Sequence, residues 1–327
     1  YLRAQGHQSE IVPLFRRDRK RFERLLQWDG PVVVAITTTL YTSVRPIREI
    51  VQFVRNRNPD AHVVVGGPYV LGAVSARASP DHQQVFRSMG ADFFVVSSRG
   101  EVELLEILRA LAANAEIVNS PNVVTRSSGY SAERLAPHPE AIALQRVEPD
   151  WSFYGRELKE FAFIQTAKSC VFRCAFCEFV VRGGRYEHLD LSTIERQLDR
   201  IADLGTVKSI VFIDDTFNVP APRFKAILRM MAEKRYPFKW SSFFRCDFAD
   251  EEALDLLVAT RCEFLKLGLE SGSQQILDTM IKGATVSAYE RGIKGLNDRG
   301  IPFWASFIIG FPGETEKTVE ETTAFIE

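Results

Sequence analysis

Three of the five cysteines stand within eight residues, in the run Cys170-Val-Phe-Arg-Cys174-Ala-Phe-Cys177. The spacing C-x3-C-x2-C places three thiolates on one tight loop, where they can hold three irons of a cubane iron–sulfur cluster. The fourth iron is then open to chelate and reduce a cofactor. Cys246 and Cys262 stand alone, so the pattern indicates a metal site in a reducing compartment and not a disulfide framework.

Two structural interpretations compete with the cluster. A zinc site would need a fourth Cys or His nearby, but His188 lies eleven residues beyond Cys177 and Cys246 is farther still. The three thiols could instead be buried together in a hydrophobic core. The loop directly follows a strand predicted over Phe161 to Thr166, the first of a βα series, and this position favours the cluster over both.

The elements that must position this loop form a series of five βα units over residues 156–327. A full (β/α)8 barrel needs about 250 residues, so we predict a partial (β/α)6 barrel whose last strand is missing. Polar or glycine-rich groups follow every strand and would line one rim, where barrel active sites lie. The predicted strands cover 161–166, 209–213, 239–245, 264–269 and 302–309, and the helices 191–204, 222–233, 251–259 and 287–298.

The first 115 residues predict a separate α/β domain with a doubly wound, Rossmann-like parallel sheet. Short apolar runs alternate with helical patterns, as in βαβ units. Gly6 is predicted to close a first helix. The predicted strands cover 11–12, 31–36, 62–65 and 91–96, and the helices 44–57 and 101–113. Ligands bind such sheets at the carboxyl ends of the strands, which here are 37–41, 66–69 and 97–101.

Residues 116–155 are rich in Ser and Pro and show little periodicity, so we predict a linker between domains 1–115 and 156–327. The chain starts at Tyr1 and stops at Glu327 inside a helical pattern. We therefore expect a protein truncated at both ends, with the first strand of the N-terminal domain and the last strand of the barrel missing.

Charge and hydropathy exclude some classes of partner. Lys plus Arg (41) nearly balance Asp plus Glu (42), so no polyanion-binding surface is expected and nucleic acid is not the default partner. No apolar run approaches the roughly 20 residues that cross a bilayer, and no signal peptide is visible. The expectation is a cytoplasmic protein that binds neither nucleic acid nor membrane.

The cysteine loop at the end of the first barrel strand resembles the radical S-adenosylmethionine (SAM) superfamily, and the resemblance covers residues 160–327. Members of that family bind SAM through its amine and carboxylate on the open iron and cleave it reductively to a 5′-deoxyadenosyl radical. The resemblance implies that Phe176 packs near the adenine, and that Asp214 and Asp215 lie where the SAM amino group binds. Arg245 would meet the SAM carboxylate, which suits a planar guanidinium.

Two further segments resemble the family in the expected order along the chain. Glu270 and Ser271 match the segment that contacts the ribose and carboxylate of SAM, and Gly310 matches a segment beside the adenine. Each match has an ordinary alternative as well. The Asp214–Asp215 pair could cap a turn, Glu270 could be a paired rim carboxylate, and Gly310 could be a turn glycine.

A doubly wound domain before such a barrel resembles the cobalamin-dependent branch of the superfamily. The resemblance implies that Thr38, Thr39 and Leu40 line the corrin or its nucleotide tail. Gly66 and Gly67 would let the backbone approach the tail closely, because glycine has no Cβ. The other matched residues are Tyr41, Pro68, Gly100 and Glu101.

The N-terminal domain departs from the pattern of many cobalamin domains. The motif Asp-x-His-x-x-Gly, whose histidine ligates cobalt from below, is not in the chain, and His7, His62 and His82 lack that context. Tyr41 or Leu40 could then lie under the corrin. A dinucleotide-binding domain is a weaker interpretation, because no G-x-G-x-x-G follows a strand.

The resemblance implies a methyltransferase that uses a 4Fe–4S cluster, SAM and cobalamin. One SAM would methylate cob(I)alamin and a second would generate the radical, so that a methyl group reaches an unactivated carbon or a phosphinate centre of a small molecule or natural product, as in the P-methylases. Rearrangement or oxidative cyclisation with the same cofactors is the alternative reaction. A cobalamin or iron–sulfur sensor without catalysis is the alternative of another class. An external electron donor such as flavodoxin or ferredoxin is the expected protein partner.

Overall fold

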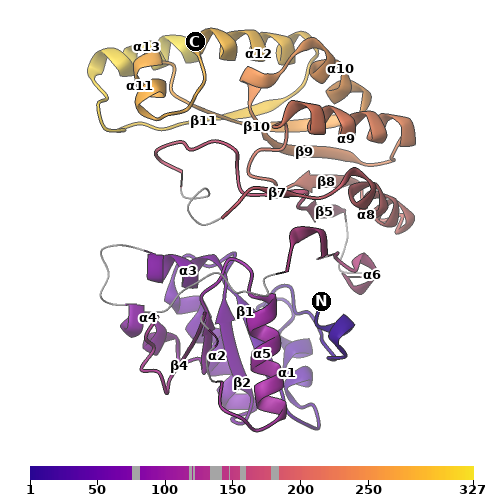
Figure 1. The fold of residues 1–327 in the computed structure, drawn as a ribbon, viewed down its shortest axis with the longest axis vertical. Coiled ribbons are helices and arrows are strands. Elements are labelled where there is room, and N and C mark those ends of the chain that lie inside the picture. The colour runs from indigo at the N-terminus through magenta and orange to yellow at the C-terminus, as the bar shows by residue number, and fades with distance from the viewer. Residues whose placement is uncertain are drawn as a thin grey trace. The chain divides into compact units, whose positions relative to one another are not determined.

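The computed structural model describes residues 1–75, 82–117, 120, 122–132, 142–146, 148–154, 160–177 and 184–327. The chain forms two compact units, Tyr1–Ile142 and Ala143–Glu327 (Figure 1). Each unit has its own hydrophobic core. Within the described ranges, no helix has the length and apolar character that a bilayer crossing requires.

The first unit is built on a four-stranded mixed sheet. Its strands lie in chain order: β1 (Val33–Thr37), β2 (His62–Gly66), β3 (Phe93–Val95) and β4 (Val123–Thr125). The first three are parallel, whereas β4 runs antiparallel to β3, so the prediction of a wholly parallel sheet is wrong at this edge. The strand β4 comes from the segment predicted as a linker. Three residues are too short to show an alternating pattern, although Val124 is buried in the core.

Helices cover both faces of this sheet, as double winding predicts. Helices α1 (Arg19–Leu26), α2 (Val44–Arg57), α3 (Pro68–Ser75) and α4 (His82–Met89) share one core, whereas α5 (Glu101–Ala112) packs Ile107 against the other face. Residues 11–12 form no strand, so that prediction is wrong. Gly6 ends a single 3-10 turn, η1 (Arg3–Gln5), in the left-handed conformation that favours glycine.

The second unit holds a five-stranded parallel sheet in the order β11-β10-β9-β8-β5. The strands are β5 (Phe161–Ile164), β8 (Ser209–Phe212), β9 (Lys239–Phe244), β10 (Cys262–Glu270) and β11 (Phe303–Phe307). The helices are α8 (Leu191–Asp203), α9 (Ala221–Lys234), α10 (Glu251–Ala259), α12 (Val286–Asp298) and α13 (Glu316–Ile326). Each predicted strand and helix of this half is present.

Short elements that the sequence pattern did not reveal complete the second unit. Strands β6 (Ala167–Lys168) and β7 (Glu187–His188) form an antiparallel pair before and after the cysteine loop. A 3-10 turn, η4 (Cys246–Phe248), follows β9, and α11 (Gln274–Thr279) follows β10. The other elements that the described residues of this unit form are η2 (Leu144–Arg146) and α6 (Trp151–Tyr154).

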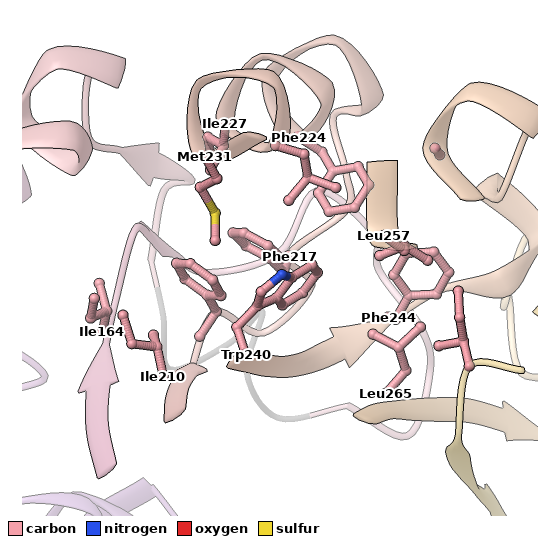
Figure 2. Close-up of a cluster of buried hydrophobic side chains, with 14 of the residues drawn as sticks. Ile164, Ile210, Phe217, Phe224, Ile227, Met231, Trp240, Phe244, Leu257 and Leu265 are labelled. Carbon is pink, nitrogen blue, oxygen red and sulfur yellow. The ribbon is translucent and has the colours of Figure 1, made fainter. Parts of the chain in front are cut away.

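An aromatic core fixes the end of β8. The rings of Phe212 and Phe217 stack with centroids 4.2 Å apart, and Trp240 meets both edge-on at 5.6 Å. Figure 2 shows Phe217 and Trp240 below side chains of α9. The buried indole N–H of Trp240 donates to the hydroxyl of Thr260 at 3.0 Å. Because Phe217 is locked in this core, the chain between β8 and Phe217 is held at the rim of the sheet.

The opposite face of the same sheet carries exposed aromatic side chains, and we call it the inner face. Side chains alternate along each strand, so residues that do not point into the helix-covered core point to this face. Phe243, Lys266 and Trp304 are neighbours across β9, β10 and β11, and Phe163 lies on β5. Phe163, Phe243 and Trp304 are 60%, 44% and 55% exposed. The Lys266 ammonium lies 5.1 Å from the centre of the Phe243 ring.

Gly292 on α12 gives a stability test of this packing. A Cβ at Gly292 would stand 2.1 Å from the carbonyl oxygen of Cys246, a backbone atom that cannot move aside cheaply. We expect Gly292→Ala to lower the free energy of unfolding by about 1–3 kcal/mol, measured by urea denaturation. Arg291→Ala, on the exposed side of α12, should change it by less than about 0.5 kcal/mol. A Gly292→Ala protein as stable as the parent would contradict this packing.

Candidate iron–sulfur and SAM site

Asp214 fixes the chain that leads into the cysteine loop. Its carboxylate is fully buried and accepts hydrogen bonds from the backbone N–H of Thr166 at 2.6 Å and of Ala167 at 2.9 Å, and from the Thr166 hydroxyl. Arg223 holds the same part of the chain, because it donates to the carbonyl and hydroxyl oxygens of Thr166. The end of β8 therefore sets where the chain leaves β5 and where the loop begins.

This geometry gives Asp214 a positioning role in place of the SAM contact that the family resemblance implied. Its oxygens are committed to Thr166 and Ala167, beneath the loop. Burial raises the pKa of Asp214 to about 6, against the hydrogen bonds from the Thr166 hydroxyl and the Ala167 N–H, which lower it. Asp215 is only partly buried, and burial raises its pKa too, opposed by Lys168.

The three cysteines lie on the loop as half-buried thiols. The sulfur of Cys170 is 3.3 Å from the Thr216 hydroxyl, and the N–H of Cys177 closes a turn by donating to the carbonyl of Cys174 at 3.0 Å. In the described part of the chain, no three Cys, His, Asp or Glu side chains gather around one point as a single metal ion would need. A cubane makes no such demand, because each thiolate binds a different iron. The donor set therefore fits a 4Fe–4S cluster.

Arg245 holds one side of the loop. Its guanidinium pairs with both carboxylate oxygens of Asp247, at 3.1 and 2.6 Å, and lies 3.9 Å from the ring centre of Phe172, which stands between Cys170 and Cys174. The Asn218 side chain bonds the N–H and carbonyl of Arg245 and so fixes its backbone. The Nη1 atom of Arg245 is buried and has no hydrogen-bond partner among the described residues. A buried donor of this kind suits a carboxylate ligand, so Arg245 fits the contact with SAM.

Lys282 holds the other side of the loop, and sequence reasoning missed it. Its ammonium pairs with the Glu270 carboxylate at 3.1 Å and lies 5.6 Å from the ring centre of Phe176, which stands between Cys174 and Cys177. Two residues earlier, the carbonyl of Met280 accepts the N–H of Ala175 at 2.8 Å. A single Lys before a glycine carries no spacing signal, so only the fold reveals this contact.

Of the other matched residues in the second unit, some lie at the ends of the strands and others pack in the core behind them. Glu270 ends β10 with a φ of 69° and has a buried carboxylate. Ser271 is buried, and its hydroxyl lies 3.1 Å from the Thr322 hydroxyl, which anchors α13. Gly310 has a φ of 87°, and its exposed N–H donates to Glu314. Phe176, Arg245 and Glu270 thus gather around the cysteine loop. Asp214 holds the chain that enters the loop, whereas Ser271 packs against α13.

The two isolated cysteines belong to the core. Cys246 is 1% exposed, and burial raises its pKa to about 12. Cys262 packs against the same core, and burial raises its pKa to about 12 as well. Both remain neutral thiols at physiological pH.

In the first unit, Thr38 and Gly67 pack against each other. The buried hydroxyl of Thr38 donates to the carbonyl of Gly66 at 2.9 Å and accepts the N–H of Tyr69 at 3.1 Å. Gly67 has a φ of 103°, and a Cβ there would stand 2.9 Å from that hydroxyl. Close packing against Thr38 and the left-handed backbone therefore explain why residue 67 is glycine. This explanation does not require the close approach of a cofactor that the resemblance implied.

The remaining matched residues of the first unit lie at the strand ends and helix starts. Leu40 is 77% exposed just beyond β1, and the hydroxyls of Thr37 and Thr39 beside it are 2.9 Å apart. Tyr41 is partly buried against the core. Pro68 begins α3, and Gly100 precedes α5, whose first residue is Glu101.

The support that Asp214 gives to the loop can be tested on the protein without cofactors. Asp214→Asn replaces an acceptor by a donor that faces N–H groups, so we expect a loss of about 1–3 kcal/mol in unfolding free energy at pH 7. The folded-state pKa is raised above the usual 3.8, so this carboxyl adds stability as the pH falls from about 6 toward 4. The Asn variant lacks that gain. The difference in unfolding free energy between the parent and Asp214→Asn, measured by urea denaturation, should therefore be larger at pH 5 than at pH 7.

Asp203→Asn, on the exposed end of α8, is the matched control and should follow the parent at both pH values. Equal stability of parent and Asp214→Asn at pH 7 and pH 5 would contradict the positioning role.

Comparisons with known proteins identify the family of the second unit. Residues 164–326 match the family model of the radical SAM superfamily. The chain is 25% identical over 312 residues to an uncharacterized methyltransferase of Pyrococcus horikoshii, covering 92% of this chain and 65% of the relative. It is 25% identical over 302 residues to the anaerobic magnesium-protoporphyrin IX monomethyl ester cyclase of Rubrivivax gelatinosus, covering 88% and 52%. The chain thus spans between about half and two thirds of the length of these relatives.

The fold is similar to that of the radical SAM methyltransferase TsrM from Kitasatospora setae, solved with cobalamin and a [4Fe-4S] cluster bound. The TM-score is 0.77 at 21% identity, and the match covers 99% of this chain and 65% of that one. The family model spans the cysteine loop and the strand ends that carry Arg245 and Glu270. The radical SAM family implies a 4Fe–4S cluster and SAM, for which the loop and Arg245 supply fitting donors. The chain is a radical SAM protein with structural similarity to cobalamin-dependent radical SAM methyltransferases.

Proposed function

We propose that this protein is a cobalamin-dependent radical SAM methyltransferase that acts on a small-molecule substrate. The observation that carries the proposal is the cysteine loop, which lies between two buried cations, Arg245 and Lys282. The unpartnered Nη1 atom of Arg245 is a donor that suits a carboxylate. When bound, the cluster supplies the electron that cleaves SAM to a 5′-deoxyadenosyl radical, and cobalamin supplies a methyl carrier.

The residues around the loop would bind and orient SAM. Arg245 Nη1 is placed to donate to the SAM carboxylate, because its other nitrogens are already held by Asp247 and Gly283. Phe176 offers an apolar ring to the adenine. Glu270, whose carboxylate Lys282 holds at the end of β10, is placed to accept from the ribose hydroxyls. Such fixed partners orient the sulfonium bond to be broken and limit the entry of water.

Cobalamin would bind the first unit at the carboxyl end of β1. An apolar side chain as exposed as Leu40 suits the flat face of a corrin, and the hydroxyl pair of Thr37 and Thr39 suits its amide groups. The TsrM structure, which is similar in fold, was solved with cobalamin bound, and this supports cobalamin as a cofactor. The electron donor would be an external protein such as flavodoxin or ferredoxin.

The inner face of the barrel sheet suits a planar, apolar substrate that carries an anionic group. Phe163, Phe243 and Trp304 present exposed rings, and Lys266 stands between the last two. Rings stack on planar apolar compounds, and an ammonium beside them would pair with a carboxylate, phosphinate or phosphate. The methyl acceptor is then an unactivated carbon or a phosphinate centre of such a compound.

A second reaction uses the same residues. The relative from Rubrivivax gelatinosus is named as a cyclase, so oxidative ring closure with both cofactors is the alternative to methyl transfer. Methyl transfer consumes one SAM to S-adenosylhomocysteine for each methyl group carried, whereas ring closure forms 5′-deoxyadenosine without it.

The central test is anaerobic reconstitution with iron, sulfide and hydroxocobalamin, followed by SAM and a reductant. We expect 4Fe–4S absorbance, 5′-deoxyadenosine and S-adenosylhomocysteine from the parent protein, and loss of the cluster and of 5′-deoxyadenosine in Cys174→Ala. Cys262→Ala removes a core thiol away from the loop and should keep both. A protein that binds zinc tightly and takes up no iron would contradict the proposal. Formation of 5′-deoxyadenosine without S-adenosylhomocysteine would favour ring closure or rearrangement over methyl transfer.

The substrate class can be tested with 2-naphthoate, an anionic planar aromatic probe, by calorimetric titration. Lys266→Met should weaken its binding about tenfold or more, because a charge-assisted contact contributes about 1.5–3 kcal/mol. Lys294→Met removes a lysine of the exposed face of α12 and should leave the affinity unchanged. Equal binding by the parent and Lys266→Met would exclude Lys266 as the anion site.

A further inference from the structure

The turn after α11, Met280–Gly283, connects two parts of the site. Met280 is fully buried, and its carbonyl accepts the Ala175 N–H of the cysteine loop. The N–H of Lys282 donates to Leu277 at 3.0 Å, and Ile281 adopts a φ of 53°, so the turn has a fixed backbone. The carbonyl of Gly283 lies 3.4 Å from Arg245 Nη2. The backbone of this turn therefore touches both the cysteine loop and Arg245.

The side chain of Lys282 is buried, which is rare for lysine. It is 7% exposed, and its partner Glu270 is 11% exposed. Room for the pair depends on Gly268, where a Cβ would stand 2.6 Å from the Glu270 carboxylate and 3.4 Å from the Lys282 ammonium. Burying two charges seldom adds net stability, because the loss of hydration offsets their attraction. The pair therefore calls for a function beyond stability.

Lys282 acts on the cysteine loop in two ways. Its ammonium lies within cation–π distance of Phe176, between the second and third cysteines. Its positive charge also lies beside the loop, because the Phe176 ring that it faces stands between the two ligands Cys174 and Cys177. A cluster on three thiolates carries negative charge, and reduction adds one more electron to it. A fixed cation beside the loop stabilises the reduced form more than the oxidised form.

We propose that Lys282 is a positioning residue that holds the Phe176 segment of the cysteine loop and, through its charge, raises the reduction potential of the cluster. This inference rests on the proposed function, because it requires that the three cysteines hold a 4Fe–4S cluster. It assigns to the Lys282–Glu270 pair an electrostatic role in addition to any contact that Glu270 makes with SAM.

The test is an anaerobic redox titration of the reconstituted full chain without SAM, followed by electron paramagnetic resonance, with iron counted for each variant. Lys282→Met removes the cation, and the double variant Lys282→Met with Glu270→Gln removes both charges without leaving a buried, unpaired carboxylate. Lys282→Met should lower the equilibrium constant for one-electron reduction at least tenfold, which corresponds to 59 mV. The double variant should lower it less, because it also removes the opposing negative charge of Glu270. Lys282→Arg keeps the charge and should stay near the parent potential.

Lys294→Met, which removes an exposed lysine of α12, is the matched control for net charge and should leave the potential unchanged. A Lys282→Met protein with full iron content and the parent potential would overturn the inference while leaving the proposed function intact. If Lys282→Met takes up no cluster, Lys282→Arg must restore both iron and potential, and its failure to do so would also overturn it. A parent protein that assembles no 4Fe–4S cluster overturns the proposed function, and this inference with it.

Discussion

The buried carboxylate of Asp214 is the constraint on which the site depends. It lies at the end of β8 and binds two consecutive backbone N–H groups, those of Thr166 and Ala167, where the chain turns from β5 into the cysteine loop. The stacked rings of Phe212 and Phe217 hold the chain on both sides of this carboxylate in the core. The packed core of the sheet thereby fixes the backbone at Thr166, four residues before the first cysteine.

Two ion pairs then define the space around the loop. Arg245 with Asp247 stands against Phe172, and Lys282 with Glu270 stands against a second phenylalanine, Phe176. Arg245 and Asp247 follow β9, whereas Glu270 ends β10 and Lys282 lies in the turn after α11. Each pair faces a different segment between cysteines. Pairs of this kind contribute orientation more than stability. Their cations also compensate the negative charge that thiolates bring into a partly buried site.

Sequence reasoning predicted the parts of the site that depend on local spacing. It missed the roles that depend on contacts between residues far apart in the chain. C-x3-C-x2-C and the alternation of strands and helices located the loop and the barrel strands. The resemblance implied ligand contacts for Asp214 and Gly67, but in the structure their neighbours give them packing roles that no local pattern encodes. Lys282 was missed because its partners lie 12 or more residues away in the chain. The strand β4 was missed because three residues are too few to show a period.

The most direct test of the central claim is Mössbauer spectroscopy of the protein reconstituted with iron-57, before and after addition of SAM. Three cysteine ligands leave one iron of the four without a thiolate, so SAM should change the isomer shift of one quarter of the iron signal and leave the rest as it was. A spectrum in which all iron stays unchanged by SAM, or a protein that retains no 4Fe–4S cluster, would contradict the account.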